Sequence, residues 1–343
     1  MKKRKRTSYK GKRQAFTNRP IKERFYTKED VFVSRMASIL MVPQGRIPWI
    51  FSQRPITTVR LNSLKGDIDD TKAELIKRGY DLREIPWSKD TYFVMNKDKA
   101  EVSQTEMYTE GRYYIQNLSS ILATLILDPK EKETILDMCA APGSKTTHIA
   151  DVTRNKATVI ANDIDMGRIS DLQSVVDQFG AKVKVTLSDG KEFGKKYPVY
   201  FDKVLLDAPC SGEGLIYFKN GDPLRFWSMD KVKRSMFEQK ELIESAFKSL
   251  KHGKYMVYST CTLEPEENEG VLTHLLKTFP NAKIEKINIK SDIFKSTPEL
   301  KQHIKPGITK WSGNVYDSQV RNAIRIVPNK MMMGFFIAKI SKE

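Results

Sequence analysis

The sequence predicts an α/β protein built on a mostly parallel, Rossmann-like sheet with helices on both faces. After residue 130, short apolar runs of strand length alternate with longer segments of helical spacing, which is the pattern of parallel sheets. Several of these runs end on an acid or a thiol: Asp163, Asp189, Asp207 and, two residues beyond its run, Cys261. Because open α/β sheets bind ligands at the carboxyl ends of their strands, we expect one active site at that edge.

The chain opens with a basic stretch. Residues 1–28 contain twelve Lys or Arg and a single acid, Glu23. Such a run cannot bury enough apolar surface to fold alone, so we expect an arm. It either lies on nucleic-acid phosphates, or serves as a solvated tail or a localisation signal.

Residues 29–112 are expected to form a small α+β domain. The patterns indicate a helix at 29–41, a strand at 57–61, a helix at 69–79 and a short strand at 92–95. Acids at the start of the second helix and Gly79 at its end are typical helix signals. This domain either positions RNA or covers the catalytic domain.

Residues 113–343 are expected to form the catalytic domain. An apolar segment of helical spacing covers 113–128. The expected strands lie at 133–138, 158–161, 183–187, 201–206, 255–259, 282–289 and 334–340, and the expected helices at 165–179, 229–250 and 264–279. Residues 291–330, rich in Lys, Pro and Ser, are expected to form an insertion or long loop beside the site.

Composition narrows the class of protein. With 59 Lys and Arg against 42 Asp and Glu, the net charge of +17 indicates a polyanionic partner, of which nucleic acid is the usual one. Three cysteines without a CxxC pair and four scattered histidines argue against a disulfide framework or a metal site and favour a reducing compartment such as the cytoplasm. No apolar run approaches membrane-spanning length, and no secretory signal is visible.

The turn after the first strand of this domain indicates the kind of cofactor. Its sequence, CAAPGSK at 139–145, lacks both the dinucleotide fingerprint and the phosphate loop. Asp163 is placed to accept hydrogen bonds from ribose hydroxyls and Asp189 to receive a base amine, although either acid alone could be a helix cap or turn former. An adenosine-containing cofactor without pyrophosphate, S-adenosylmethionine, fits this set.

Five segments together carry a family resemblance: ILDMCAAPGSKT, ANDID, SDG, DAPCSGEG and YSTCTLEPEENE. They resemble the nucleolar-protein/Sun family of S-adenosylmethionine-dependent RNA cytosine-5 methyltransferases. The resemblance runs from RLNSLK at 60–65 to GFFIAKI at 334–340. It implies a class I methyltransferase sheet with an antiparallel last strand, a monomeric enzyme, and 5-methylcytidine in ribosomal or transfer RNA as product.

The resemblance also assigns site residues. It makes Cys261 the nucleophile, and Cys210 the thiol that assists product release. The implied cofactor contacts are Cys139, Ala140, Ala141, Pro142, Gly143, Ser144, Lys145, Asp163, Arg168, Asp189 and Asp207. Ser144 is a difference, because the family usually has glycine there.

The chemistry explains why two thiols are needed. A thiolate that adds to carbon 6 of cytosine makes carbon 5 nucleophilic, and Asp207 is the candidate to hydrogen-bond the ring's Watson–Crick edge. We expect Lys145 and a helix start near Pro265 to lower the pKa of Cys261. Glu264, Glu266 and Glu267 are expected to point away from the thiol as first-turn helix acids.

Alternatives stay open at this point. Cys210 can be the nucleophile instead, or the cysteines can be small buried hydrophobes; Cys139 is expected to pack in the core or cofactor loop. The chain can also be an RNA-binding ribosome-assembly factor whose methyltransferase activity is secondary or lost. Methylation of an exocyclic amine is disfavoured, because DAPC is not the Asn/Asp-Pro-Pro-aromatic motif of that reaction.

Overall fold

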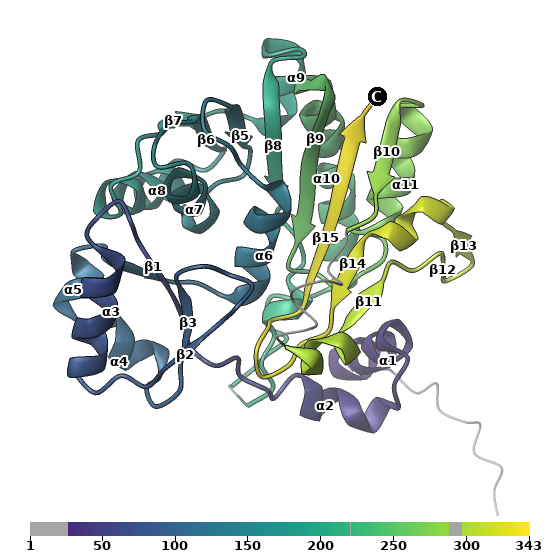
Figure 1. Ribbon diagram of the computed structural model, residues 1–343. Coiled ribbons are helices and arrows are strands. Elements are labelled where there is room, and N and C mark those ends of the chain that lie inside the picture. Colours follow the sequence, from purple (N-terminus) through teal and green to yellow (C-terminus); the bar gives the residue numbers. More distant parts are fainter. Residues whose placement is uncertain (1–26, 220, 288–296) are drawn as a thin grey trace, which may run out of the picture.

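The computed structural model describes residues 27–219, 221–287 and 297–343 (Figure 1). Most of the predicted basic arm, residues 1–26, therefore lies outside the described residues. The last two residues of the predicted strand at 282–289, residues 288 and 289, lie outside them as well.

A nine-stranded sheet forms the centre of the molecule. Its order is β11-β14-β15-β9-β8-β5-β6-β7, with β10 paired to β15. The strands are β5 (Thr134–Asp137), β6 (Thr158–Asp163), β7 (Lys184–Leu187), β8 (Phe201–Asp207), β9 (Leu250–Thr260), β10 (Ala282–Glu285), β11 (Ile304–Pro306), β14 (Ile324–Ile326) and β15 (Phe335–Lys342). Strands β5 to β9 pair in parallel, whereas β15 is antiparallel to β9. The predicted fold class, including the antiparallel last strand, is confirmed.

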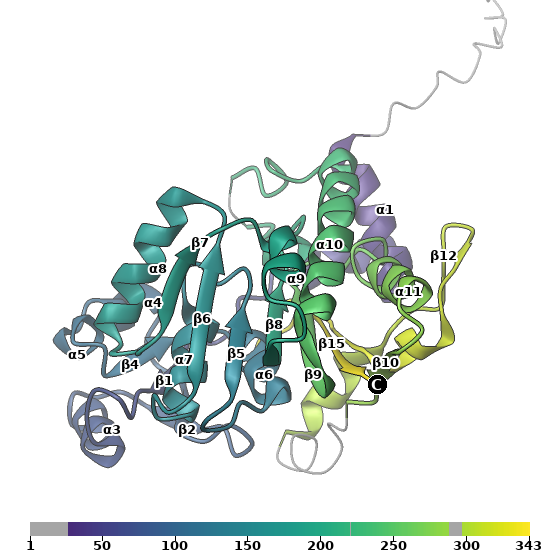
Figure 2. The same ribbon diagram turned by 90° about the horizontal axis from the view of Figure 1, so that it is seen from above.

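Helices pack on both faces of this sheet (Figures 1 and 2). They are α6 (Leu118–Leu127), α7 (Ser144–Val152), α8 (Met166–Gln178), α9 (Phe193–Lys196), α10 (Met229–Ser249) and α11 (Glu269–Thr278). One core cluster joins α9, α10 and α11 to the sheet, and a second joins α6 and α7 to it. The large buried side chains of these clusters, among them Phe201, Phe247 and Phe336, make the sheet a rigid base for the loops at its carboxyl edge.

A second, four-stranded sheet lies at the side of the molecule, in the order β2-β3-β1-β4. Its strands are β1 (Thr58–Leu61), β2 (Leu82–Glu84), β3 (Thr91–Val94) and β4 (Tyr113–Ile115), accompanied by α3 (Ile68–Lys77), α4 (Lys99–Ser103) and α5 (Glu106–Thr109). The apolar segment 113–128 is therefore not a single helix. Its first residues pair with β1, where Leu61 faces Tyr113, so the small sheet extends past the predicted domain boundary at residue 112.

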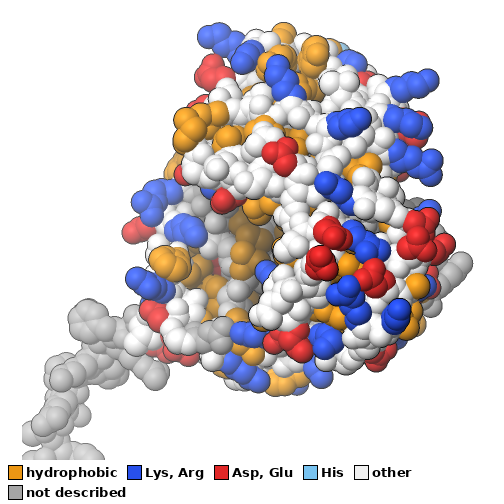
Figure 3. Space-filling view, turned by 90° about the vertical axis from the view of Figure 1, so that its left-hand side faces the viewer, with side chains coloured by type: hydrophobic (Ala, Val, Ile, Leu, Met, Phe, Trp, Pro, Cys, Tyr) orange, Lys and Arg blue, Asp and Glu red, His pale blue; other side chains and the backbone are white. Residues whose placement is uncertain are grey.

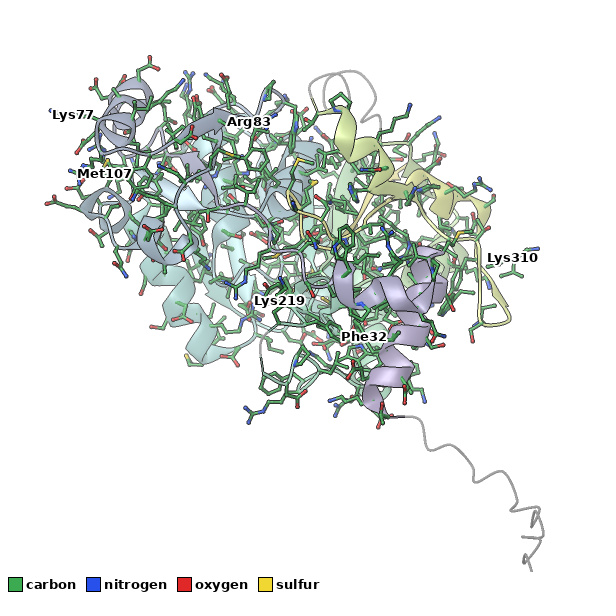
Figure 4. All side chains as sticks on the ribbon, turned by 90° about the horizontal axis from the view of Figure 1, so that it is seen from below. Phe32, Lys77, Arg83, Met107, Lys219 and Lys310 are labelled. Atoms are coloured by element: carbon green, nitrogen blue, oxygen red, sulfur yellow. The ribbon has the colours of Figure 1, made fainter. Side chains whose placement is uncertain are left out.

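The first two helices, α1 (Lys28–Leu40) and α2 (Ile47–Ile50), pack away from this small sheet. Thr27 and Asp30 form a capping box that begins α1, as such pairs do. Phe32 is buried with Trp227 and Leu263 of the catalytic part of the chain. Figure 4 shows Phe32 far from Lys77 and Met107 of the small domain. The predicted 29–112 unit thus divides between two packing sites.

Two other predictions about elements are wrong. The last helix begins at Glu269, not at residue 264, because the side chain of Asn268 bonds to Thr260 and to the carbonyl of Thr262 and holds the preceding residues in a turn. Residues 291–296 of the predicted insertion or long loop at 291–330 lie outside the described residues, and the described part, 297–330, is an insertion with strands of its own and not one long loop. It contributes β11 and β14 to the main sheet and a hairpin of β12 (Lys310–Trp311) and β13 (Asn314–Val315), from which the labelled Lys310 projects in Figure 4.

Among the described residues, no helix is long and apolar enough to span a membrane. The same part of the chain has no group of three or more His, Cys, Asp or Glu side chains that could hold a metal ion.

Candidate active site

Neighbouring strands bring the two thiols of the site together. Strands β8 and β9 are parallel, with Asp207 opposite Ser259, so the loops that follow them leave the sheet side by side. The sulfur atoms of Cys210 and Cys261 lie 2.9 Å apart, and both cysteines are free. The two strand edges, and the thiols that follow them, therefore lie next to each other.

Asp207 is held from two sides at the end of β8. Its Oδ2 accepts a hydrogen bond from Lys145 Nζ at 2.6 Å, and its Oδ1 accepts one from Ser259 Oγ at 2.7 Å. The Lys145 ammonium also lies 5.5 Å from the ring centre of Phe335. Because the side chain of Lys145 is only 9 % exposed while that of Asp207 is 28 % exposed, Lys145 orients a carboxylate that faces the cleft.

A buried polar network lies beneath the Cys210 loop. Glu267 accepts hydrogen bonds from Ser211 N at 3.1 Å and Gln239 Nε2 at 2.8 Å, and also from Ser211 Oγ. Glu213 accepts a hydrogen bond from Trp227 Nε1 at 2.5 Å, and one of its oxygens lies 2.8 Å from Ser211 Oγ. Burial, followed by the nearby Glu213 charge, raises the pKa of Glu267 to about 8. Glu267 is therefore not a first-turn helix acid as predicted, because α11 begins only at Glu269 and Ser211 and Gln239 hold Glu267 under the loop.

The two other acids of the motif face α1. The fully buried Glu264 and the half-buried Glu266 both pair with Arg35, at 2.5 Å and 2.9 Å. Glu266 also accepts a hydrogen bond from Trp311 Nε1 at 3.1 Å. They are therefore not first-turn helix acids but anchor α1 to the loop that follows Cys261.

The opposite half of the site is formed by the ends of β5, β6 and β7. Asp163 is buried, and its carboxylate accepts from Ala141 N at 3.2 Å and lies 3.3 Å from an Arg168 nitrogen. Arg168 also donates to the carbonyl of Ala141 at 2.5 Å. Asp189 caps the short 3₁₀ turn after β7 by accepting from Lys191 N. These contacts fix the loop after β5 against the end of β6.

Several of these groups line one cleft of about 770 Å³. The predicted site residues that line it are Cys139, Ala141, Asp163, Arg168, Asp189, Asp207, Cys210 and Cys261. Figure 3 shows a hollow with hydrophobic side chains inside it on the face that lies to the left in Figure 1. Acidic and basic groups, both thiols and apolar surface thus converge in a single concavity, as expected of an active site.

Five predicted site residues stand apart from the cleft lining: Ala140, Pro142, Gly143, Ser144 and Lys145. Gly143 has φ +110°, and a Cβ there would meet Leu172 at 3.0 Å, so glycine serves the packing of this loop on α8. Ser144 is the first residue of α7. These residues form the loop after β5 and the start of α7 without lining the cleft.

Sequence reasoning missed the rim of the cleft. The segment that includes Asp222, Pro223 and Phe226 lines it, together with Glu238 of α10. Phe226 is 76 % exposed and lies 5.2 Å from the Arg225 guanidinium. The only available signal was an aromatic residue next to an arginine, in a stretch without strand or helix periodicity.

Two of the three cysteines have a raised pKa. The hydrogen bond with Cys261, followed by burial, raises the pKa of Cys210 well above its usual value. Burial likewise raises the pKa of Cys139, in line with its expected role in packing. The start of α11 lies eight residues beyond Cys261, so the predicted contribution from a helix start near Pro265 does not apply.

Comparisons with known proteins agree with this geometry. The family model of the 16S rRNA methyltransferases RsmB/F matches residues 124–341. The tRNA (cytosine(49)-C(5))-methyltransferase of Pyrococcus abyssi is 40% identical over 86% of this chain and 91% of its own length. The ribosomal RNA small subunit methyltransferase F of Aliivibrio fischeri is 36% identical over 85% of this chain, which spans only 59% of that relative's length.

A solved structure, a methyltransferase homolog from Pyrococcus horikoshii, superposes with a TM-score of 0.76 at 30% identity, covering 93% of this chain and 96% of that one. NSun6 of the same organism shares the fold, with a TM-score of 0.71 at 24% identity over 92% of this chain and 98% of that one. The chain therefore belongs to the RsmB/RsmF methyltransferases, a branch of the nucleolar-protein/Sun family of RNA cytosine-5 methyltransferases.

Proposed function

We propose that this protein transfers a methyl group from S-adenosylmethionine to carbon 5 of a cytidine in ribosomal or transfer RNA, through a covalent bond between Cys261 and the base. The observation that carries the proposal is the pair of free thiols, 2.9 Å apart, in the same cleft as Asp207. A paired thiol has no use in methylation of an exocyclic amine, whereas addition to and release from a pyrimidine ring uses two sulfur groups in different steps.

The cleft fits the proposed cofactor. The carboxylates of Asp163 and Asp189 offer acceptors for ribose hydroxyls or for an amine, and Ile164, 59 % exposed at the end of β6, offers an apolar surface for a base. Asp163 is held in place by Ala141 N and Arg168, so its orientation is set before any ligand binds. When bound, S-adenosylmethionine supplies the methyl group.

The first covalent step belongs to Cys261. Its thiolate gives an electron pair to carbon 6 of the ring, and the former double bond makes carbon 5 a nucleophile. Asp207 can accept a hydrogen bond from, or share a proton with, the Watson–Crick edge, which stabilises the charge that develops on the ring. Lys145 and Ser259 keep the carboxylate in one orientation. Because Cys210 keeps its proton more firmly than a free thiol, it can donate a hydrogen bond to the Cys261 thiolate.

Release requires the second thiol. Once Cys261 is bonded to carbon, its sulfur is a weaker hydrogen-bond partner, so the largest contribution to the high pKa of Cys210, the hydrogen bond between the two sulfurs, is reduced. Cys210 can then lose its proton to solvent and accept the proton from carbon 5. The electron pair of the carbon–hydrogen bond restores the ring double bond, and the bond between Cys261 and carbon 6 breaks with its pair returning to sulfur.

The roles of the two cysteines can be separated by trapping. We expect Cys261→Ala to abolish methyl transfer and the covalent protein–RNA adduct, and Cys210→Ala to let the adduct persist on a denaturing gel. Ser174→Ala, at an exposed position of α8 outside the cleft lining, is the matched control and should retain activity. An adduct that is lost in Cys210→Ala and kept in Cys261→Ala would reverse the assignment.

The target RNA is identified separately. Bisulfite sequencing of total RNA from cells with and without the protein should reveal one or a few cytidines whose protection depends on it. Protection that is restored by the wild type but not by Cys261→Ala supports the enzyme. A strain that loses no protected cytidine, while assembling ribosomes abnormally, would favour the RNA-binding assembly factor instead.

A further inference from the structure

A second pocket of about 380 Å³ adjoins the active-site cleft. The two concavities share one wall, formed by Leu215, Ile216 and Tyr217. This wall includes the end of the 3₁₀ turn Glu213–Leu215, which directly follows the Cys210 loop. The pocket therefore lies directly beside the proposed RNA site. Only the shared wall, Leu215–Tyr217, separates the two.

Hydrogen bonds between distant segments build the pocket. Phe218 N donates to the carbonyl of Phe51 at 2.9 Å, and Ile56 N donates to that of Lys330 at 2.8 Å. Across the floor, Met333 N donates to Asn117 Oδ1 at 3.3 Å. The walls thus come from the linker after α2, the end of β4 and the loop before β15. The hydrogen bonds above connect these segments to one another. Such a pocket lies between the small domain and the catalytic sheet and is already formed without a ligand.

The chemistry of the lining suits a nucleotide. Its apolar surface comes from residues such as Phe51, Ile56 and Met333, and polar groups come from Gln53 and Thr57. The guanidinium of Arg54 lies 4.6 Å from the ring centre of Tyr217, the stacked arrangement on which RNA-binding proteins hold unstacked bases. Its described lining residues include two exposed cations, Arg54 and Lys99, and no Asp or Glu, so the mouth attracts phosphate. The active-site cleft, in contrast, contains five acids.

We infer that this second pocket binds the base of the nucleotide next to the target cytidine. The inference rests on the proposed function, because a cytidine that is turned into the cleft leaves its neighbour without a stacking partner. A neighbouring base seated beyond the shared wall would hold the RNA backbone across Leu215 and recover that stacking. The pocket would then contribute to the choice of sequence around the methylated position.

The test combines a change in the RNA with a change in the protein. The probes are single-stranded RNAs with one cytidine, first with randomised neighbours and then with an abasic nucleotide on either side of the cytidine. In the wild type, we expect the abasic nucleotide on one side to lower kcat/KM about fivefold or more, as loss of one stacked base does. Thr57→Trp, which fills the pocket, should lower kcat/KM for the intact RNA by a similar factor. With this variant, the abasic RNA should have a kcat/KM less than about twofold below that of the intact RNA.

Equal abasic penalties in the wild type and Thr57→Trp would overturn the inference, because the base would then lie elsewhere. Gln53→Trp at the same pocket provides a second filling variant should Thr57→Trp fold poorly. Thr109→Trp, at the exposed end of α5, is the matched control and should behave as the wild type. Thermal melting and S-adenosylmethionine affinity report whether each variant is intact.

A second readout separates the pocket from the proposed reaction. The same RNA carries 2-aminopurine next to the cytidine, and its fluorescence is followed on binding. We expect a change that occurs with the wild type and Thr109→Trp and is lost with Thr57→Trp. If no RNA is methylated but the fluorescence change is seen with the wild type and lost with Thr57→Trp, the proposed function is wrong and the assignment of the pocket is supported. If methylation proceeds and the fluorescence change survives in Thr57→Trp, the pocket assignment fails alone.

Discussion

At the scale of single residues, the site depends on side chains that orient other side chains. Asp207 faces the cleft, but Lys145 and Ser259 decide where its oxygens lie. The Cys210 loop is held in the same way, since the backbone nitrogen of Ser211 donates to the buried Glu267. The reacting groups are thus few, and most of the motif residues around them are supports.

The exposed ring of Phe226 should hold RNA at the rim of the cleft. Removing an aromatic platform for one base costs about 1–3 kcal/mol, so we expect Phe226→Ala to raise KM for RNA about fivefold or more and to leave S-adenosylmethionine affinity unchanged. Steady-state kinetics on an RNA substrate measure this. The control is Phe237→Ala, which removes a ring that is 63 % exposed on α10 and does not line the cleft. Equal KM values for both variants would show that Phe226 has no special contact.

Glu267 should give the protein a pH-dependent stability. Burial raises its pKa from 4.5 to about 8, so between these values the folded state keeps a proton that the unfolded chain releases. The stabilisation is complete below about pH 4.5 and is lost as the pH rises through 8. In Glu267→Gln this decline should be absent, and the difference between the two slopes should be at most about 1.4 kcal/mol per pH unit. Urea unfolding at several pH values measures the slopes, and parallel curves would contradict the prediction.

At the scale of elements, the start of α11 is set by contacts from outside the helix. Its first residue, Glu269, is fully buried and pairs with Arg325 of β14 through two contacts of 2.5 Å and 2.6 Å. Glu269 also accepts a hydrogen bond from Ile308 N at 2.8 Å. The helix is therefore tied to the segment 304–326, which the sequence had suggested to be a loop.

Breaking that ion pair should destabilise the whole catalytic sheet. Removing one partner of a buried pair leaves an uncompensated charge and costs about 3–5 kcal/mol. We expect Arg325→Met to lower the free energy of unfolding by this amount in urea titrations. Arg321→Met, at an exposed position of the neighbouring 3₁₀ turn, should change it by less than about 0.5 kcal/mol.

At the scale of the whole molecule, the N-terminal helices belong to the architecture of the active site. Phe32 of α1 packs against Trp227, whose indole nitrogen donates to Glu213 beneath the Cys210 loop. At the first residue of α1, Lys28 Nζ donates to the carbonyl of Arg225 at 3.1 Å. The point at which the basic stretch joins the described chain is thus next to the rim segment that carries Phe226.

This position leads to a prediction about the basic stretch. Each phosphate contact adds about 0.7 to the slope of log affinity against log salt for single-stranded RNA. Deletion of residues 1–24 should therefore weaken RNA binding at low salt and reduce that slope. Filter binding over a salt series measures both, with replacement of Lys2, Lys3, Arg4, Lys5 and Arg6 by glutamine as an intermediate variant. An unchanged slope would leave this stretch as a solvated tail or a localisation signal.

Features that depend on local pattern were predictable. The strands of the main sheet follow from apolar runs, and the site edge follows from the polar residues at their ends, because parallel strands carry those ends to one side. Asp163, Asp207, Cys210 and Cys261 were found in this way, and all of them line the cleft.

Other features were decided by partners far away in the sequence. Proline and acids at 264–267 resemble a helix start, but Arg35 and Ser211 take these acids, and Asn268 holds the turn until Glu269. Tyr113–Ile115 is as apolar as the helix that follows, yet it becomes a strand because β1 offers an open edge. The sequence by itself determined the fold class and the family, and it pointed to the candidate site residues. Only the tertiary structure decided which of them face the cleft and what supports them, since burial and long-range hydrogen bonds leave no periodic trace in the chain.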